Sequence, residues 1–111
     1  SKLEDRFATE ILPGVSESNS CVRRQFRVRV SPDDAVVLVH YTSDYAIWTP
    51  ESAAWTKRGW VCVLWEVKDS RRKPHSDELT RPKLARLQNP WISEIWLATW
   101  DGWEWKNRQL A

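Results

Sequence analysis

The chain has 111 residues, of which 41% are hydrophobic and 29% are charged, and its formal net charge at pH 7 is +2. This length suits one hydrophobic core and is too short for two ordinary domains, so residues 1–111 are expected to form a single domain. No apolar run approaches the roughly 20 residues of a membrane helix, and charged residues stand where a signal peptide would need apolar ones. We therefore expect an intracellular, cytoplasmic protein without a membrane span.

The N-terminal segment predicts a short helix. Ser1 and Glu4 form a capping-box pattern, and apolar residues recur at intervals of four. The helix is expected to run to about Leu12, where Pro13-Gly14 ends it.

The remaining elements are expected to be mostly strands. By alternation or apolar content, the expected strands are 22–30, 35–41 with a continuation or restart through Tyr45 and Trp48, 60–68, 92–100 and 103–106, and the expected helix is 77–88. Segment 60–68 has bulky residues on both faces, which predicts a central strand covered from both sides. Pro82 favours the first turn of a helix, which would place the ordered start near Arg81. The expected fold is α/β, a mixed central sheet flanked by helices in the order α-β-β-β-α-β-β.

The connections have turn signals, and the cysteines have none of the spacings of a metal site. Turns are expected at 32–34 and at Asp101-Gly102, with a loop at 49–59. Cys21 and Cys62 fit neither a zinc knuckle nor a disulfide scaffold, so we expect two buried free thiols.

Two charges end the expected central strand. Glu66 and Lys68 are two residues apart, so they project from the same face. Charges placed after an apolar run require a partner, such as a metal ion or an opposite charge. The pair is either a mutual ion pair at a strand end or part of a functional site.

Asp44 favours the functional site. It follows the expected second strand within Tyr41-Thr42-Ser43-Asp44-Tyr45, and its carboxylate could reach the end of a neighbouring strand. Two carboxylates and a lysine can cleave a phosphodiester, because oxygen ligands hold Mg²⁺, which activates water and polarises the phosphate. Taken singly, an aspartate in this place is more often a turn residue.

These motifs resemble those of the PD-(D/E)XK nuclease superfamily, in particular the phage-encoded junction-resolving endonucleases and related short phage and prophage nucleases. Residues 1–7 resemble a helix whose glutamate points at the metal. Residues 41–45 resemble a Tyr-x-x-Asp-Phe motif, and Glu66-Val67-Lys68 matches Glu-x-Lys. Gln25-Phe26 lies where a Gln and an apolar residue often precede the motif strand. The resemblance covers roughly residues 1–88.

The resemblance implies a restriction-endonuclease-like core and a Mg²⁺-dependent endonuclease that hydrolyses DNA, with Mn²⁺ able to substitute. Glu4, Asp44 and Glu66 would bind the metal, the main-chain carbonyl of Val67 would add a ligand, and Lys68 would assist the attacking water. Glu4 is equally well explained as a helix cap. The implied substrate is branched, Holliday-junction-like or otherwise structured DNA, and paired cuts would require a homodimer.

The chain departs from the family pattern at two points. Ser43 stands where the family usually has proline before the aspartate. The separation of 22 residues between Asp44 and Glu66 is longer than is common, which implies an inserted hairpin loop at 49–59. Both departures affect the expected strand register.

A basic stretch follows the proposed site. Between positions 57 and 86 there are nine Lys or Arg against four Asp or Glu. Such a stretch is usually a solvated face, but beside a nuclease site it could grip flanking phosphates. The candidate DNA-binding residues are Arg71, Arg72, Lys73, Lys83 and Arg86. His40 and His75 lack metal-ligand spacing, and we expect both to be non-catalytic.

The chain has nine tryptophans, five of them between positions 91 and 105. They fit core packing, a dimer interface or base stacking, and the sequence leaves all three open. Two functions other than a nuclease also remain: a non-catalytic nucleic-acid-binding module, and a phage protein-interaction module that uses the Trp-rich C-terminal sheet.

Overall fold

The structure is a computed structural model that describes residues 1–31, 39–50, 59–71 and 76–111, with side chains from residue 80 onward in the last range. Its elements are α1 (Lys2–Glu10), α2 (Leu12–Val15), β1 (Cys21–Val30), β2 (Val39–Pro50), β3 (Trp60–Asp69), α3 (Ser76–Gln88), β4 (Ile92–Trp100) and β5 (Trp105–Gln109). Apart from the short α2, this order is the one that the sequence predicts. No helix among the described residues has both the length and the apolar content to cross a membrane.

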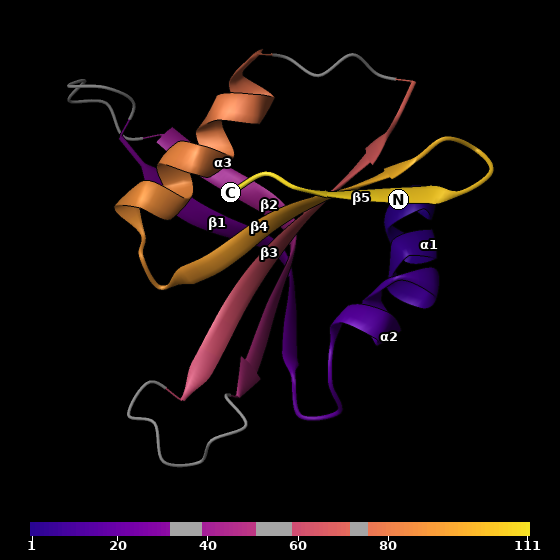
Figure 1. The fold of residues 1–111 in the computed structure, drawn as a ribbon, viewed down its shortest axis with the longest axis horizontal. Helices are drawn as coiled ribbons and strands as arrows, with labels where there is room; N and C mark the ends of the chain where they lie inside the picture. The colour runs from indigo at the N-terminus through magenta and orange to yellow at the C-terminus, as the bar shows by residue number, and fades with distance from the viewer. Residues whose placement is uncertain (32–38, 51–58, 72–75) are drawn as a thin grey trace.

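The five strands form one mixed sheet in the order β1-β2-β3-β4-β5 (Figure 1). β1, β2 and β3 are antiparallel neighbours, β4 lies parallel to β3, and β5 is antiparallel to β4. A parallel neighbour requires a crossover connection, and the segment that contains α3 supplies it. The expected α/β class and mixed sheet are confirmed, and β3 is the central strand.

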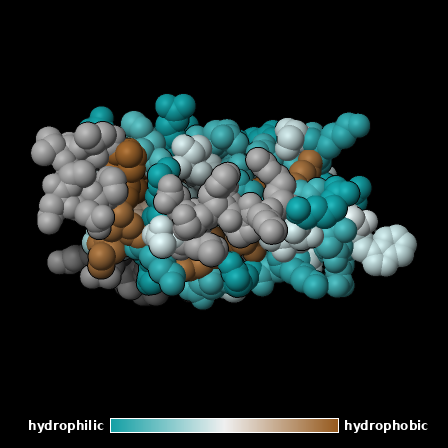
Figure 2. Space-filling model, turned by 90° about the horizontal axis from the view of Figure 1, so that it is seen from above, coloured by the Kyte–Doolittle hydropathy of each residue, from teal (hydrophilic) through white to brown (hydrophobic). Residues whose placement is uncertain are grey.

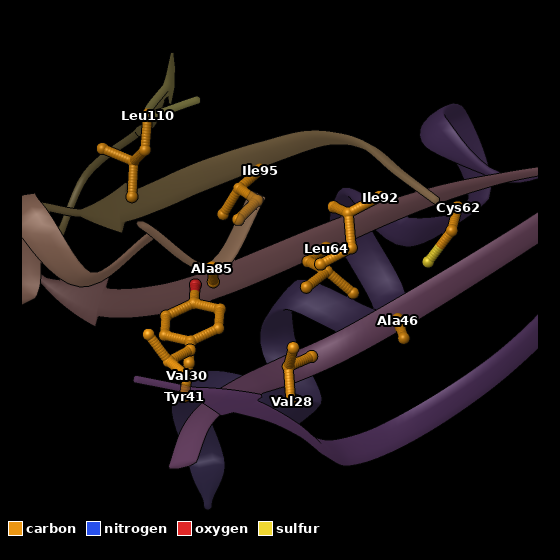
Figure 3. Close-up of a cluster of buried hydrophobic side chains, with 10 residues drawn as sticks. All are labelled: Val28, Val30, Tyr41, Ala46, Cys62, Leu64, Ala85, Ile92, Ile95 and Leu110. Atoms are coloured by element: carbon orange, nitrogen blue, oxygen red, sulfur yellow. The ribbon is translucent and has the colours of Figure 1, made fainter. Parts of the chain in front are cut away.

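Both faces of the sheet are covered. On one face, Leu64 of β3 packs with Ala85 of α3 in a cluster that Figure 3 shows in close-up. On the other face, Trp65 of β3 packs with Phe7 of α1. Neighbouring residues of a strand point to opposite faces, so α3 and α1 lie on opposite sides of the sheet. We call these sides the α3 face and the α1 face.

The expected end of the first helix is wrong. α1 ends at Glu10, and Pro13-Gly14 lies inside the following turn of helix, Leu12–Val15, instead of after a longer helix. Proline is tolerated there because its missing N–H falls in the first turn, where no helical hydrogen bond is lost.

The expected position of Pro82 is also wrong. α3 begins at Ser76, so Pro82 lies inside the helix and not in its first turn. Pro82 is fully buried, so packing of its ring offsets part of the cost of the lost helical hydrogen bond.

The turn of the C-terminal hairpin is longer than expected. β4 has the expected bounds, but β5 starts at Trp105, two residues later than predicted. The Asp101 carboxylate accepts the main-chain N–H groups of Trp103 (2.7 Å) and Glu104 (2.8 Å), and Gly102 has φ 97°. These bonds extend the turn, because they hold the two N–H groups away from a strand ladder.

Some expected connections lie outside the described residues, and one of the two cysteines is not buried as expected. The turn at 32–34, the strand start at 35–38 and most of the loop at 49–59 lie outside the described residues, whereas Thr49 and Pro50 belong to β2. Both cysteines are free, and Cys62 is buried as expected, but Cys21 is exposed. Cys21 is the first residue of an edge strand, where fewer neighbours cover a side chain.

Candidate active site

Asp44 lies where the pairing of β2 and β3 stops. The paired register of these strands reaches Tyr45 opposite Trp65, and Asp44 is the next residue of β2 toward its start. Its Oδ2 accepts the main-chain N–H of Val67 at 2.7 Å. Main-chain N–H groups of a strand point within the plane of the sheet. The Asp44 carboxylate therefore lies where β2 and β3 separate, in the middle of β2, and it is joined to the residue between Glu66 and Lys68.

Gln25 joins Asp44 to the N-terminal helix. Its Nε2 donates to Glu4 Oε1 at 3.3 Å and to Asp44 Oδ1 at 3.4 Å. Gln25 has φ 53°, a left-handed conformation that is uncommon for a residue other than glycine. This backbone interrupts the alternation of β1, so that Arg24 and Gln25, although neighbours, both contact Glu4. The structure thus brings residues of α1, β1 and β2 to one point.

Glu4 is held both as a cap partner and as a member of this cluster. Its main-chain N–H donates to the Ser1 hydroxyl at 3.2 Å, which confirms the cap at Ser1. Its carboxylate accepts from Arg24 Nη2 at 3.2 Å and from Gln25. The Tyr45 hydroxyl donates to the Glu4 main-chain oxygen at 2.9 Å. The carboxylate of Glu4 is therefore aimed at the β-sheet beside Asp44, and α1 is fixed to β2.

The pKa of Asp44 is raised above its ordinary value of 3.8. Burial is the largest cause, and the hydrogen bond and negative charge of Glu4 raise it further. The N–H of Val67 and the positive charge of Lys68 oppose the shift, because both favour the ionised carboxylate. Asp44 therefore has an acidic neighbour on one side and a basic neighbour on the other.

This shift makes stability depend on pH. Folding raises the pKa of Asp44 above 3.8, so its contribution to the free energy of unfolding is fully present below that pH. The contribution is lost as the pH rises through the folded-state pKa. Asparagine does not titrate, so the stability of Asp44→Asn relative to wild type should increase with pH in this window. Urea unfolding at several values between about pH 4 and pH 7 measures it, and a difference independent of pH would refute this origin.

Glu66 is buried, with 8% of its surface exposed, near the same end of β3. Its neighbours Trp65 and Val67 pack on the α1 face, so Glu66 projects toward the α3 face. There it is the charge that acts most strongly on Tyr41. Burial, then Glu66, then Asp44 raise the pKa of that phenol, although the hydroxyl makes no well-formed hydrogen bond within the described part of the chain. Both acids thus act on one buried hydroxyl.

The predicted site residues are only partly assembled. Glu4 and Asp44 come together, and Asp44 is close enough to Lys68 for that ammonium to lower its pKa. Glu66 lies beyond them, toward Tyr41. In ranges 1–31, 39–50, 59–71 and 80–111, no three His, Cys, Asp or Glu side chains are grouped closely enough to hold a metal ion.

The expected DNA-binding residues do not form one surface. Arg71 is exposed, but its guanidinium forms two hydrogen bonds with Asp69, at 3.0 and 2.6 Å. Lys83 and Arg86 are exposed on α3, so they lie on the face of the sheet opposite α1 and Glu4. Arg72 and Lys73, like His75, lie outside the described residues.

The sequence contained a basic segment closer to the cluster. β1 has four arginines in ten residues and no acidic residue. Arg24 contacts Glu4, and Arg27 and Arg29 follow along the same strand. The strict alternation of Arg27 and Arg29 with Val28 and Val30 was the signal for this exposed basic face, because it sets one charged side against one apolar side.

The tryptophans divide between the interior and the surface. Trp65 is buried and stacks on Trp96, with 5.6 Å between ring centroids, and Trp105 packs against the same cluster. Trp91 and Trp103 are exposed, by 45% and 91%. Core packing therefore accounts for part of the set, and the exposed members leave the interface and stacking interpretations open. Figure 2 shows a side of the molecule on which hydrophilic residues predominate and apolar ones form smaller patches.

A scan against protein-family models finds no match for this sequence, and searches of curated proteins and of solved structures find none either. The function is accordingly inferred from the fold, the contacts and the chemistry of this chain alone.

Proposed function

We propose that this protein is a metal-dependent endodeoxyribonuclease of the PD-(D/E)XK type. The observation that carries the proposal is the hydrogen bond from Val67 N–H to Asp44 at 2.7 Å. It attaches an acid of β2 to the main chain between Glu66 and Lys68, which are the acid and the base of the Glu-x-Lys motif. Asp44, Glu66 and Lys68 are the proposed catalytic residues, and Glu4 is a fourth.

The arrangement of elements supports the same proposal. A helix is followed by three antiparallel strands, a second helix and a strand parallel to the third. The restriction-endonuclease-like core that the resemblance implies would have such an order, and this agreement supports the proposal. It places both motifs on adjacent strands, β2 and β3, and a glutamate of α1 beside them.

The donor set suits a divalent cation. Glu4 and Asp44 are neighbouring carboxylates, and their mutual repulsion contributes to the raised pKa of Asp44. A cation between acids relieves such repulsion, and carboxylate and carbonyl oxygens are the ligands that Mg²⁺ and Mn²⁺ take. Asp44, Glu66, Glu4 and the Val67 carbonyl would hold the metal. When bound, Mg²⁺ would polarise the phosphate and make water more acidic.

The protein's own groups would orient the reaction. The Lys68 ammonium acts on Asp44, so it is placed to donate a hydrogen bond to water or to a phosphate oxygen beside that carboxylate. Gln25 donates one amide nitrogen to two acids, which fixes the direction of both without adding charge. The Val67 N–H fixes the second oxygen of Asp44. These contacts hold the acids in place before any substrate binds.

The proposal is tested with supercoiled plasmid and a synthetic four-way junction, each incubated with Mg²⁺, Mn²⁺ or EDTA. Wild type is expected to nick DNA only with a divalent cation, and Glu66→Ala is expected to lose that activity. Circular dichroism and the unfolding midpoint show whether the variant is folded. Equal cleavage by the two proteins would reject the assignment. DNA binding without cleavage by either would favour a non-catalytic binding module.

A further inference from the structure

An exposed basic surface continues from the candidate site along β1 and β2. Arg27 is paired with Thr42, and Arg29 is paired with His40, across the two antiparallel strands. All four side chains are exposed. Cross-strand partners point to the same face, so they form one polar surface, which we call the β1–β2 basic surface.

This surface lies on the α1 face. Val28 and Val30 are buried in the cluster that includes Ala85 of α3, and Arg27 and Arg29 alternate with them. The arginines therefore point to the other side of the sheet, where Gln25 meets Glu4 of α1. With about 3.4 Å per strand residue, Arg27 and Arg29 are about 7 and 14 Å from Gln25 along β1.

These two arginines differ from the other described arginines near the site. Arg24 forms ion pairs with Glu4 and Asp5, and Arg71 forms one with Asp69. Within the part of the chain that the structure describes, neither Arg27 nor Arg29 has an acidic side chain within ion-pair distance. Two like charges on one face of a strand repel each other, and no ion pair among the described residues offsets this repulsion.

We infer that Arg27 and Arg29 bind the phosphate backbone of duplex DNA and lead it to Glu4 and Asp44. The delivery of DNA to Glu4 and Asp44 rests on the proposed nuclease function, whereas the binding of DNA by the two arginines does not. Guanidinium groups form bidentate, charge-assisted hydrogen bonds with phosphate oxygens. Their spacing of about 7 Å is twice the axial spacing of phosphates on one DNA strand, about 3.4 Å. Thr42 and His40 would add hydrogen bonds at the same positions.

Charged residues also protect edge strands from pairing with other chains, and β1 is an edge strand. Arg23 separates the two roles. It lies on the same strand and is exposed, but it is paired with Ala46, which belongs to the cluster on the α3 face. Edge protection would involve all three arginines, whereas DNA bound on the α1 face would involve Arg27 and Arg29 and leave Arg23 free.

The test measures binding without cleavage. Fluorescence anisotropy of a labelled duplex of about 30 base pairs is recorded in EDTA at several salt concentrations, with wild type, the double variant Arg27→Gln/Arg29→Gln and the control Arg23→Gln. Each lost phosphate contact lowers the slope of log affinity against log salt by about 0.9, so the double variant should lose about 1.8. At about 0.05 M salt this slope corresponds to roughly tenfold weaker binding per arginine.

Retained affinity and slope in Arg23→Gln, together with their loss in the double variant, would support the inference. Equal losses of affinity and slope in Arg23→Gln and in the double variant would overturn it. A wild type that does not bind the duplex at about 0.05 M salt would also overturn it. Because EDTA removes divalent cations, these outcomes do not depend on Asp44 or Glu66. A wild type that cleaves plasmid while the double variant binds DNA normally would overturn this surface and leave the nuclease proposal in place.

Discussion

Replacing Asp44 with Asn is expected to reduce metal-dependent DNA cleavage by at least about a thousandfold while leaving the protein folded. Asparagine retains an oxygen that can accept the N–H of Val67, so the structural hydrogen bond at 2.7 Å survives. The change removes the negative charge that a cation would require and that Glu4 repels. Initial rates of plasmid nicking in Mg²⁺ and in Mn²⁺ measure the effect.

Two further variants isolate the role of the Asp44 charge. Asp5→Asn removes an acid from the same helix as Glu4. Because Asp5 is 70% exposed and is not a proposed metal ligand, this variant should cleave DNA at the wild-type rate. Asp44→Ala leaves Val67 N–H without its acceptor, so it should be inactive and also less stable by about 1–3 kcal/mol. If Asp44→Asn cleaved DNA at the rate of Asp5→Asn, Asp44 would have no catalytic role.

Replacing Phe7 with Ala is expected to lower the free energy of unfolding by about 3–5 kcal/mol. Phe7 is fully buried, and its ring centroid lies 5.1 Å from that of Tyr45, 5.5 Å from Trp65 and 5.9 Å from Trp105. A loss of this size is a large part of the 5–15 kcal/mol that typically holds a domain together. Because Phe7 anchors α1, the variant should also release Glu4 from Asp44.

Urea unfolding followed by tryptophan fluorescence measures this loss. Leu87→Ala is the matched control, because Leu87 is also a large apolar residue on a helix but is 77% exposed. Its expected change is within about 0.5 kcal/mol. If Phe7→Ala also changed stability by less than about 1 kcal/mol, α1 would not be anchored on the sheet through this ring.

Elements with a strong local pattern could be predicted from the sequence. Residues 60–68 are apolar on both faces, which is enough to identify the central strand, and β1 is recognisable from its alternating valines and arginines. Boundaries set by single contacts could not be predicted. β5 starts late because Asp101 captures two N–H groups, and α3 begins before Pro82 although proline favours the first turn of a helix.

The site could be predicted as a set of residue types but not as a geometry. The spacing of Glu66 and Lys68 places both side chains on the same face of the strand, but it does not say which face of the sheet that is. The meeting of Asp44 with Val67 depends on where the β2–β3 ladder ends, which follows from long-range register and not from local sequence. The left-handed backbone of Gln25 has no local signal, because glutamine is not a residue that favours it. The side of the sheet that each acid faces therefore required the structure.

The most direct test of the central claim is the position of a bound metal ion. Crystals grown or soaked with Mn²⁺ would locate the ion by its anomalous scattering. The proposal predicts one ion at direct ligand distance from carboxylate oxygens of both Asp44 and Glu66, with the Lys68 ammonium beside it. An ordered structure in saturating Mn²⁺ with no ion there, and with Glu66 still directed toward Tyr41, would contradict the nuclease proposal.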